Sequence, residues 1–250
     1  MKIKIAIVDS RISLLEQRRL TLEGFRVITL PPYSKLSAPV ASHTDMLIHR
    51  VGNEYLSFAD YCEEASYVFS DISLLLVPTG AKMTFTADEV SSEYPSDAGL
   101  NALHMGNKLF CRSESISPRL AEAANENGIE IIHTKQGYPA CTVLKLCDDA
   151  AITADRGMAD ILERNGINVT LIENGDIILE PYEYGFIGGA GGVYDGVLYF
   201  FGDPSTHRSY GAIKAAADAV GLRITALSDG ALRDLGGILF AEGYINEYGQ

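Results

Sequence analysis

Residues 119–131 read RLAEAANENGIEI, a stretch with helical periodicity followed by Gly128 and an apolar, β-branched strand start. The same phrase occurs three more times, and such recurrence is the sequence signature of a repeat architecture. The other copies are Leu14–Glu23 with Gly24, Gly157–Asn165 with Gly166, and Tyr210–Val220 with Gly221. Because glycine accepts the positive φ that ends a helix, each copy predicts a helix followed at once by a strand.

A second recurring feature precedes three of these helices: two apolar runs joined by a polar two-residue turn, the pattern of a β-hairpin. The turns are Gly106-Asn107, Asp148-Asp149 and Asp195-Gly196. A fourth hairpin over residues 49–56 precedes Tyr61–Ser66, which we expect to form a shortened helix. Possible helix caps or first-turn residues are Ser10, Ser117-Pro118, Asp155 and Ser205. The repeating unit is therefore strand, turn, strand, helix, strand.

The fifth unit is split between the two ends of the chain. Leu235–Phe240 supplies its first strand, and Lys2–Val8, the Leu14 helix and Arg26–Leu30 supply the rest. Pairing the two ends closes a ring and removes exposed sheet edges. We therefore expect one α/β domain over residues 1–250, a five-bladed α/β propeller of ββαβ units. The blades are expected at about 231–250 with 1–30, 42–78, 97–134, 140–172 and 185–228.

A doubly wound α/β sheet is the alternative architecture. Its helices also end with glycine, although it lacks a regular hairpin before every helix. Residues 79–96 fit neither arrangement, because Pro78, Gly80, Pro95 and several serines and threonines indicate a long loop over one face. This loop is a candidate lid.

The composition limits the class of function. The chain has 33 acidic and 20 basic residues, and its net charge of −13 disfavours nucleic acids and anionic membranes and mildly attracts cations. Solubility explains the acidic balance better than a charge adapted to a ligand. No apolar run approaches the roughly 20 residues of a membrane span, and Met1–Asp9 is too short for a signal peptide. The four cysteines form no CxxC pair, which argues against zinc and disulfides and predicts a cytoplasmic protein.

Polar residues gather at the starts of the first strands, which would lie nearest the axis of a ring. These starts are His43-Thr44-Asp45, Ser96–Asn101, Ala140-Cys141-Thr142, Gly188–Gly192 and Arg233–Gly237. In an extended chain His43 and Asp45 would point to the same side, so an imidazole and a carboxylate could face one ligand. Asp97, Asn101 and Asp234 could bind a cationic group. The ordinary alternative is a turn histidine beside a capping aspartate, and Asp234 could likewise be a turn residue.

Cys141 is the best candidate nucleophile because it lies at a strand start, after Gly137-Tyr138-Pro139. Cys147 is expected on a hairpin face, and Cys62 and Cys111 in structural positions. The alternative for Cys141 is a small buried residue, the usual state of a free cysteine.

The run Gly185–Gly192 is similar to a dinucleotide-binding loop, but a hairpin follows it where such a loop needs a helix. Close packing of backbones at a narrow ring centre, or room for a ligand, explains the glycines better. A metal site has little support, because no HxH or HExxH spacing occurs.

Five strand–hairpin–helix units, with His43-Thr44-Asp45 in one blade and Cys141 two blades later, resemble the pentein fold of the guanidino-group-modifying enzymes. That family includes arginine deiminases, dimethylarginine dimethylaminohydrolases and amidinotransferases. The resemblance implies that Cys141 attacks a guanidinium carbon, that His43 shuttles protons and that Asp45 holds the cationic nitrogens, with Asp97 as a second carboxylate. The predicted substrate-binding set is completed by Asn101, Thr142 and Asp234.

Members of that family carry the cysteine close to the C-terminus, whereas Cys141 is central here. Either the blades are cyclically shifted in this chain, or the match at His43-Thr44-Asp45 and Cys141-Thr142 is accidental. The same ring occurs without catalysis in a ribosome-binding translation factor, so a binding role is compatible with the resemblance.

We therefore expect a hydrolase or amidinotransferase that acts on a small cationic, arginine-like substrate without a cofactor. A non-catalytic ring that binds a ligand or a protein is the first alternative, and it predicts an unreactive Cys141 among apolar neighbours. A nucleotide-binding doubly wound domain is the second, and it requires a helix directly after Gly188–Gly192. The sequence leaves the substrate and the oligomeric state open.

Overall fold

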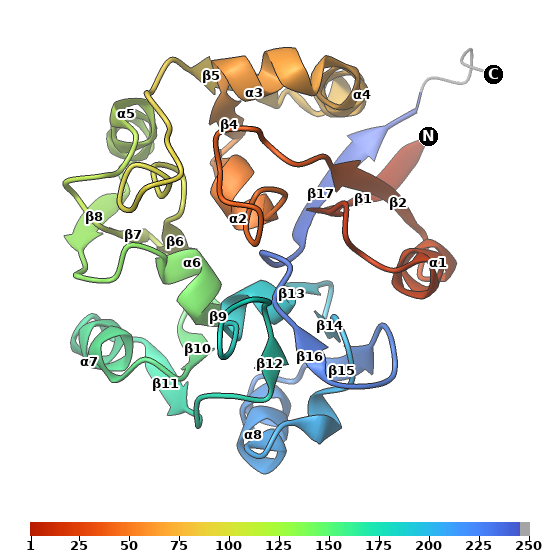
Figure 1. Ribbon diagram of the computed structural model, residues 1–250, viewed down its shortest axis with the longest axis vertical. Helices are drawn as coiled ribbons and strands as arrows, with labels where there is room; N and C mark the ends of the chain where they lie inside the picture. The colour runs from red at the N-terminus through yellow and green to blue at the C-terminus, as the bar shows by residue number, and fades with distance from the viewer. Residues whose placement is uncertain (246–250) are drawn as a thin grey trace.

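The computed structural model describes residues 1–245, and Figure 1 shows its elements arranged around a common centre. Positions 246–250 of the blade predicted at 231–250 lie outside the described residues. Within the described part, the strands form five three-stranded sheets and a two-stranded sheet. The three-stranded sheets, in spatial order, are β17-β1-β2 (Leu239–Tyr244, Lys2–Asp9, Phe25–Leu30), β3-β4-β5 (His49–Val51, Glu54–Phe58, Lys82–Thr86), β6-β7-β8 (Leu103–Met105, Lys108–Cys111, Glu130–His133), β9-β10-β11 (Val143–Cys147, Ala150–Thr153, Asn168–Leu171) and β13-β14-β15 (Gly191–Tyr194, Val197–Phe200, Arg223–Ala226). The two-stranded sheet joins β12 (Ile177–Ile178) to β16 (Leu232–Arg233).

All the three-stranded sheets are built in the same way. The central strand pairs antiparallel with its first neighbour and parallel with its second. A parallel partner requires a crossover connection, and helices supply it here. The crossover helices are α1 (Leu14–Leu22), α3 with α4 (Ala59–Glu64, Ser66–Leu76), α5 (Pro118–Glu126), α7 (Arg156–Arg164) and α8 (Tyr210–Ala219), which lie at the rim in Figure 1. The described strands form separate small sheets, so the doubly wound alternative is wrong.

Short helical turns lie nearer the centre, immediately before the first strands of three sheets. α2 (Thr44–Leu47) precedes β3, α6 (Pro139–Thr142) precedes β9, and the 3₁₀ turn η2 (Gly188–Ala190) precedes β13. Further 3₁₀ turns are η1 (Val77–Thr79) and η3 (Pro204–Thr206). The side chains at the inner ends of these three sheets therefore lie on short helical turns, and the backbone of each turn determines where those side chains point.

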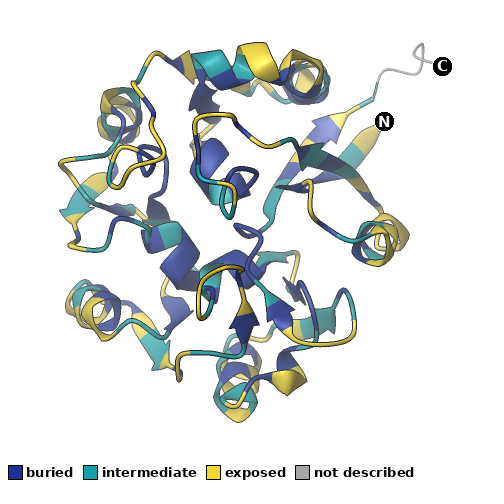
Figure 2. Cartoon of the chain, in the orientation of Figure 1, coloured by how far each residue is buried: buried dark blue, intermediate teal, exposed yellow. Residues whose placement is uncertain are grey.

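The core lies between adjacent sheets and beneath the rim helices. In α4, for example, Val68, Ile72 and Leu75 are buried at helical spacing, whereas Leu74 is exposed. Figure 2 shows the same division throughout, with buried residues toward the centre and exposed residues on the outer faces of the rim helices. No helix within residues 1–245 is long and apolar enough to cross a membrane.

The predicted hairpins and helix ends are confirmed. The paired strands flank the expected turns in β6-β7, β9-β10, β13-β14 and β3-β4. Gly24, Gly128, Gly166 and Gly221 follow the four helices with φ of +89°, +68°, +83° and +71°. These signals are local, because a positive φ and a two-residue turn each depend on only a few consecutive residues.

Some predicted helix starts are wrong. Ser13, rather than Ser10, caps α1, because its hydroxyl and the Glu16 carboxylate form a capping box. Ser205 lies in η3, and α8 begins only at Tyr210.

The segment after the first hairpin also differs from the prediction. The helix expected at Tyr61–Ser66 is not shortened: after a break at Ala65, α4 continues to Leu76, where its buried face is still apolar. Residues 79–96 are not loop throughout, because Lys82–Thr86 forms β5. The strand expected at Leu235–Phe240 begins only at Leu239 and pairs antiparallel with β1, so the preceding residues are free to turn.

Candidate functional site

The elements nearest the centre bring together several predicted site residues that lie far apart in the sequence. His43 directly precedes α2, Asp45 lies in the first turn of α2, and Cys141 lies in α6. Asp234 follows β16. The Asp45 backbone N–H donates to the Gly236 carbonyl at 3.1 Å, which ties α2 to the turn that carries Asp234.

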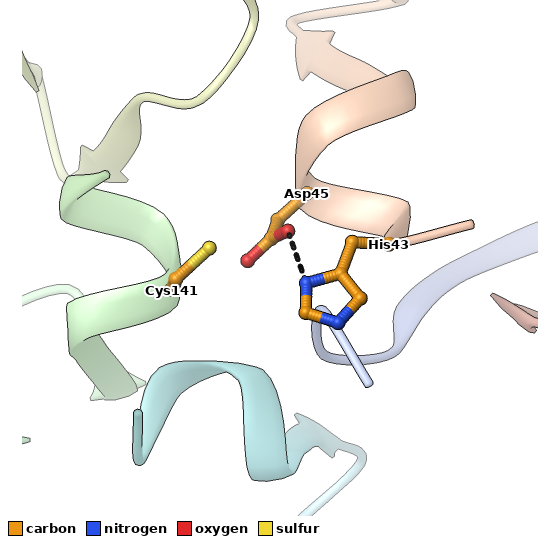
Figure 3. A group of neighbouring side chains, drawn as sticks. All are labelled: His43, Asp45 and Cys141. Atoms are coloured by element: carbon orange, nitrogen blue, oxygen red, sulfur yellow. Dashed lines mark ion pairs between the residues drawn. The ribbon is translucent and has the colours of Figure 1, made fainter. Parts of the chain in front are cut away.

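The expected arrangement of His43 and Asp45 is wrong in its backbone and yet leaves the two side chains adjacent. The chain is helical from Thr44, so the pair is not on an extended strand. His43 Nδ1 nevertheless lies 3.9 Å from Asp45 Oδ1, and Figure 3 shows Asp45 between His43 and Cys141. The Cys141 Sγ, an Asp45 oxygen and a His43 ring nitrogen lie within 4.8 Å of one another. A thiol, an imidazole and a carboxylate therefore share one small volume.

Asn101 holds the cysteine in place. Its Nδ2 donates to Cys141 Sγ at 3.1 Å and to Met46 Sδ at 3.3 Å, and its Oδ1 accepts from the Ala140 backbone N–H at 2.9 Å. Asn101 is 2% exposed. The structure thus places this residue behind the thiol rather than on an open surface.

Asp234 is a buried residue that accepts hydrogen bonds both within its own turn and from a second segment. Its Oδ2 accepts from the Phe186 backbone N–H at 2.8 Å, and its Oδ1 accepts from the Gly236 N–H at 3.1 Å. Oδ1 also lies 3.8 Å from His43 Nδ1. A Cβ at Gly189 would stand 1.8 Å from this oxygen, so the glycine is required for Asp234 to fit.

The glycine run Gly185–Gly192 therefore packs against other backbone and side-chain atoms. A Cβ at Gly188 would lie 2.2 Å from the Ala140 carbonyl oxygen, which explains how α6 and η2 approach closely. η2 leads directly into strand β13, so the helix that a nucleotide loop requires does not follow. The dinucleotide interpretation of this run is wrong.

A cavity of about 660 Å³ opens above the thiol. Of the predicted residues, His43, Cys141, Asp97 and Asp234 line it. Its other lining residues are largely aromatic or apolar, with Glu183 as a further acid; they are Ser37, Val40, Met46, Tyr94, Gln136, Tyr138, Leu179, Tyr182, Glu183, Tyr184 and Phe186. This size is ordinary for a site that binds a small molecule.

Asp97 is bound by a residue that sequence reasoning did not assign to the site. The Tyr138 hydroxyl donates to Asp97 Oδ2 at 2.6 Å, while Oδ1 is buried without a hydrogen-bond partner among the described residues. Tyr138 lies three residues before Cys141, but nothing in the sequence connects it to Asp97. That connection is tertiary.

Three predicted residues do not line this cavity: Asn101 lies behind the thiol, and Thr142 and Asp45 line other cavities. The Thr142 hydroxyl donates back to the Tyr138 carbonyl at 2.7 Å within α6, and Thr142 lines a separate cavity near Asp155. Asp45 lines a third cavity of about 440 Å³, together with His49 and His104. The Asp45 carboxylate therefore lies between the Cys141 thiol and this cavity of about 440 Å³.

Burial controls the protonation of the site. It raises the pKa of Asp45 to about 7, with a further contribution from the Asp234 charge, and it raises the pKa of Asp234 to about 6 and that of Asp97 above its ordinary value. Burial and the nearby Arg11 charge lower the pKa of His43 to about 3.

The pKa of the Cys141 thiol is raised, as are the pKa values of the neighbouring carboxyls. Burial, followed by the charges of Asp45 and Asp234, raises the pKa of Cys141 well above its ordinary value. Both Asp45 oxygens and both His43 ring nitrogens lack hydrogen-bond partners among the described residues. The ligand-free site therefore holds a neutral thiol, a neutral imidazole and carboxyl oxygens without hydrogen-bond donors. A guanidinium or an ammonium could donate to these oxygens, and a thiol-binding divalent metal could be coordinated by the same group of side chains.

Comparison with known proteins gives a family and a fold. The family described as "Family of unknown function (DUF6873)" matches residues 7–239. No curated protein matches the chain. Solved structures do, at identities so low that they show the fold alone.

Three of these structures are an amidinotransferase, SxtG, of saxitoxin biosynthesis from Microseira wollei, an inosamine-phosphate amidinotransferase from Streptomyces griseus, and an arginine dihydrolase of the ornithine-ammonia cycle in cyanobacteria. SxtG has a TM-score of 0.53 at 13% identity, over 90% of this chain and 88% of its own. The Streptomyces enzyme has 0.54 at 17%, over 88% and 75%. The dihydrolase has 0.55 at 13%, over 98% and 40%. The chain thus has the predicted pentein-like α/β fold and belongs to the family of unknown function DUF6873.

Proposed function

We propose that this protein binds a small guanidino cation in the cavity above Cys141 and cleaves one of its C–N bonds through that thiol. One observation carries the proposal: the Cys141 thiol and the His43 imidazole line one cavity together with Asp97 and Asp234, and the Asp45 carboxyl lies beside the thiol and the imidazole. Asp45 and Asp97 oxygens have no hydrogen-bond partner among the described residues. The similar solved structures named above include two amidinotransferases and an arginine dihydrolase, which supports the same kind of chemistry.

The carboxyls supply what a guanidinium needs. A guanidinium presents five N–H donors in a plane, and buried carboxylates accept them in charge-assisted hydrogen bonds. The free Asp97 Oδ1 and the Asp45 oxygens are available acceptors. A cation placed among them would favour ionisation of Asp45 and Asp234, and its own charge beside Cys141 would favour the thiolate.

The proposed chemistry follows from these positions. The Asp45 and Asp234 carboxylates, ionised when the cation binds, lie 3.9 and 3.8 Å from His43 Nδ1 and raise the pKa of His43 above its value of about 3 in the ligand-free site. His43 then accepts the Cys141 proton as the sulfur attacks the guanidinium carbon, and it returns that proton to the departing amine. An S–C bond forms and a C–N bond breaks, which leaves a thiouronium on Cys141. When the terminal nitrogen has left, water adds to the same carbon, His43 takes one of its protons, and the sulfur leaves as a thiolate to give a ureido product. When the amine of the substrate chain has left instead, a second amine adds in place of water and takes the amidino group.

The architecture proposed with this function is one domain over residues 1–250, a closed five-bladed propeller. Its blades are the units at about 231–250 with 1–30, 42–78, 97–134, 140–172 and 185–228, and the repeated sheet construction within residues 1–245 supports it. Relative to the enzymes of this fold, the blades would be cyclically shifted, since Cys141 is central. All four cysteines are free, and the reducing cytoplasm that we propose for the protein would keep Cys141 as a thiol.

The test is affinity labelling of the native protein with 2-chloroacetamidine, a cationic guanidinium mimic, in parallel with neutral chloroacetamide. We expect the cationic reagent to modify Cys141 at least about ten-fold faster than the neutral one, because only the cation is drawn to the carboxyls. Cys62 and Cys147, which are partly exposed, are internal references mapped in the same digest. His43→Gln should slow labelling at Cys141 alone.

Labelling of Cys141 no faster than at these references, with no preference for the cation, would contradict the proposal. The protein would then be the non-catalytic binding ring, in which the buried cysteine has a packing role.

A further inference from the structure

We infer that the substrate carries a guanidinium and no carboxylate: an ω-guanidino amine rather than an α-amino acid such as arginine. This inference rests on the proposed function and narrows its substrate class. It comes from the charges of the cavity beyond the thiol, which recognise the rest of the ligand.

The cavity offers no cationic partner to an anionic group. Its charged lining residues within the described chain are Asp97, Glu183 and Asp234, and its one imidazole, His43, is neutral. A carboxylate drawn into this space would lose water without gaining a positive partner, and it would face negative charge of its own sign. The α-carboxylate of an amino acid such as arginine, at the end opposite the guanidinium, is therefore repelled by the acidic lining of the cavity.

Two arginines act on residues that line the cavity, since burial and then the Arg11 charge lower the pKa of His43, and Arg112 donates to the Tyr94 hydroxyl. Arg11 donates from Nε to both Asp9 oxygens, at 3.0 and 3.1 Å. Arg112 stacks on the Tyr94 ring at 5.3 Å and donates to its hydroxyl at 2.5 Å; its Nε has no hydrogen-bond partner among the described residues but is buried and has the Glu114 carboxylate at 3.7 Å. Neither guanidinium lines the cavity.

The walls and mouth suit a chain with a second positive end. Tyr94 and Tyr138 pack with ring centroids 5.4 Å apart and both line the cavity, so they offer aromatic surface to methylenes or to a cation. Glu183 is exposed and lines the same cavity, beside the exposed Tyr182. A ligand whose guanidinium binds the unpaired Asp97 Oδ1 would leave its far end for the Glu183 carboxylate, where an ammonium is favoured.

The experiment compares agmatine with L-arginine, which differ only by the carboxylate. Binding is measured by isothermal titration calorimetry on the full chain carrying Cys141→Ala, which removes the chemistry. We expect agmatine to bind at least about ten-fold more tightly than arginine. We expect Glu183→Gln to weaken agmatine several-fold and arginine little, whereas Glu180→Gln, an exposed acid outside the cavity lining, should change neither.

The outcomes distinguish a failure of this inference from a failure of the proposed guanidino-modifying function. Equal or tighter binding of arginine overturns the inference and leaves the guanidino site intact. Binding of neither compound at millimolar concentration, by a folded variant, overturns both. If Cys141→Ala does not fold, as judged by circular dichroism, Cys141→Ser keeps the side-chain volume and takes its place.

Discussion

The replacement Asp45→Asn should stabilise the ligand-free protein at alkaline pH. The Asp45 carboxyl is buried in the centre of the molecule, its oxygens have no hydrogen-bond partner within residues 1–245, and the Asp234 carboxyl is near. Asparagine has the same shape and no charge. The substitution therefore removes an electrostatic cost, and the asparagine oxygen can still accept from the Cys141 and Asn101 side chains, whose proximity offsets part of the rise that burial causes in the pKa of Asp45.

The magnitude follows from the pKa. Burial and Asp234 raise the pKa of Asp45 from 3.8 to about 7 in the folded protein. A carboxyl with a raised folded-state pKa stabilises the fold fully below its unfolded pKa, and this stability is lost as pH rises through the folded pKa. At 1.36 kcal/mol per unit, the ionised carboxylate costs up to about 4 kcal/mol above pH 7 and almost nothing near pH 4.

The assay is thermal unfolding by circular dichroism from pH 4 to pH 8.5, on wild type, Asp45→Asn and the control Asp195→Asn. The control removes one negative charge from an exposed turn, where φ of +48° suits asparagine. We expect the Asp45→Asn midpoint to exceed the wild-type midpoint by at least about 5 °C at pH 8 and to match it at pH 4, at about 2–4 °C per kcal/mol. A difference that does not change with pH, or a variant less stable than wild type at pH 8, would refute the reasoning.

Two further predictions concern stability. Gly236→Ala should destabilise the fold by about 3 kcal/mol or more, because the new Cβ would lie 2.4 Å from His43 Cβ at a φ of +69°. The control Gly230→Ala also has a positive φ but lies in open space, and it should cost only about 1 kcal/mol. Chemical denaturation measures both variants, and equal losses would contradict the packing argument. Burial alone would raise the pKa of Glu54, but hydrogen bonds from Arg119 hold it below its usual 4.5. Arg119→Gln leaves Glu54 with the Lys82 ammonium at 3.4 Å, so it should cost about 2 kcal/mol at pH 7. That loss should shrink as pH falls below 4.5, since the stability contributed by a lowered carboxyl pKa disappears on protonation; a urea titration at pH 7 and pH 3.5 measures it, and an equal loss at both would count against the ion pair.

Part of the site could be read from the sequence. Polar residues at the starts of predicted inner strands pointed to His43, Asp45, Cys141 and Asp234, and the structure brings these four side chains together. The i, i+2 spacing of His43 and Asp45 predicted an extended chain, whereas a single helical turn, α2, carries Asp45 and begins directly after His43. Thr142 was assigned to the site only because it is next to Cys141, and its hydroxyl instead donates to the Tyr138 carbonyl.

Other features left no signal in the sequence. The bond from Tyr138 to Asp97 joins positions 41 residues apart, and the fit of Asp234 depends on the absence of a Cβ at Gly189. The protonation states depend on burial of the whole cluster, which no local pattern reports.

The sequence by itself determined the repeating unit, the hairpin turns and the glycines that end four helices, because each depends on the φ and side-chain alternation of a few neighbouring residues. Only the tertiary structure decided that Asp234 lies 3.8 Å from His43, that Asn101 holds the Cys141 thiol, and that the cavity above it has acidic but no basic lining among the described residues. Proximity and desolvation arise from the packing of segments distant in the chain, so they appear only when the sheets are assembled.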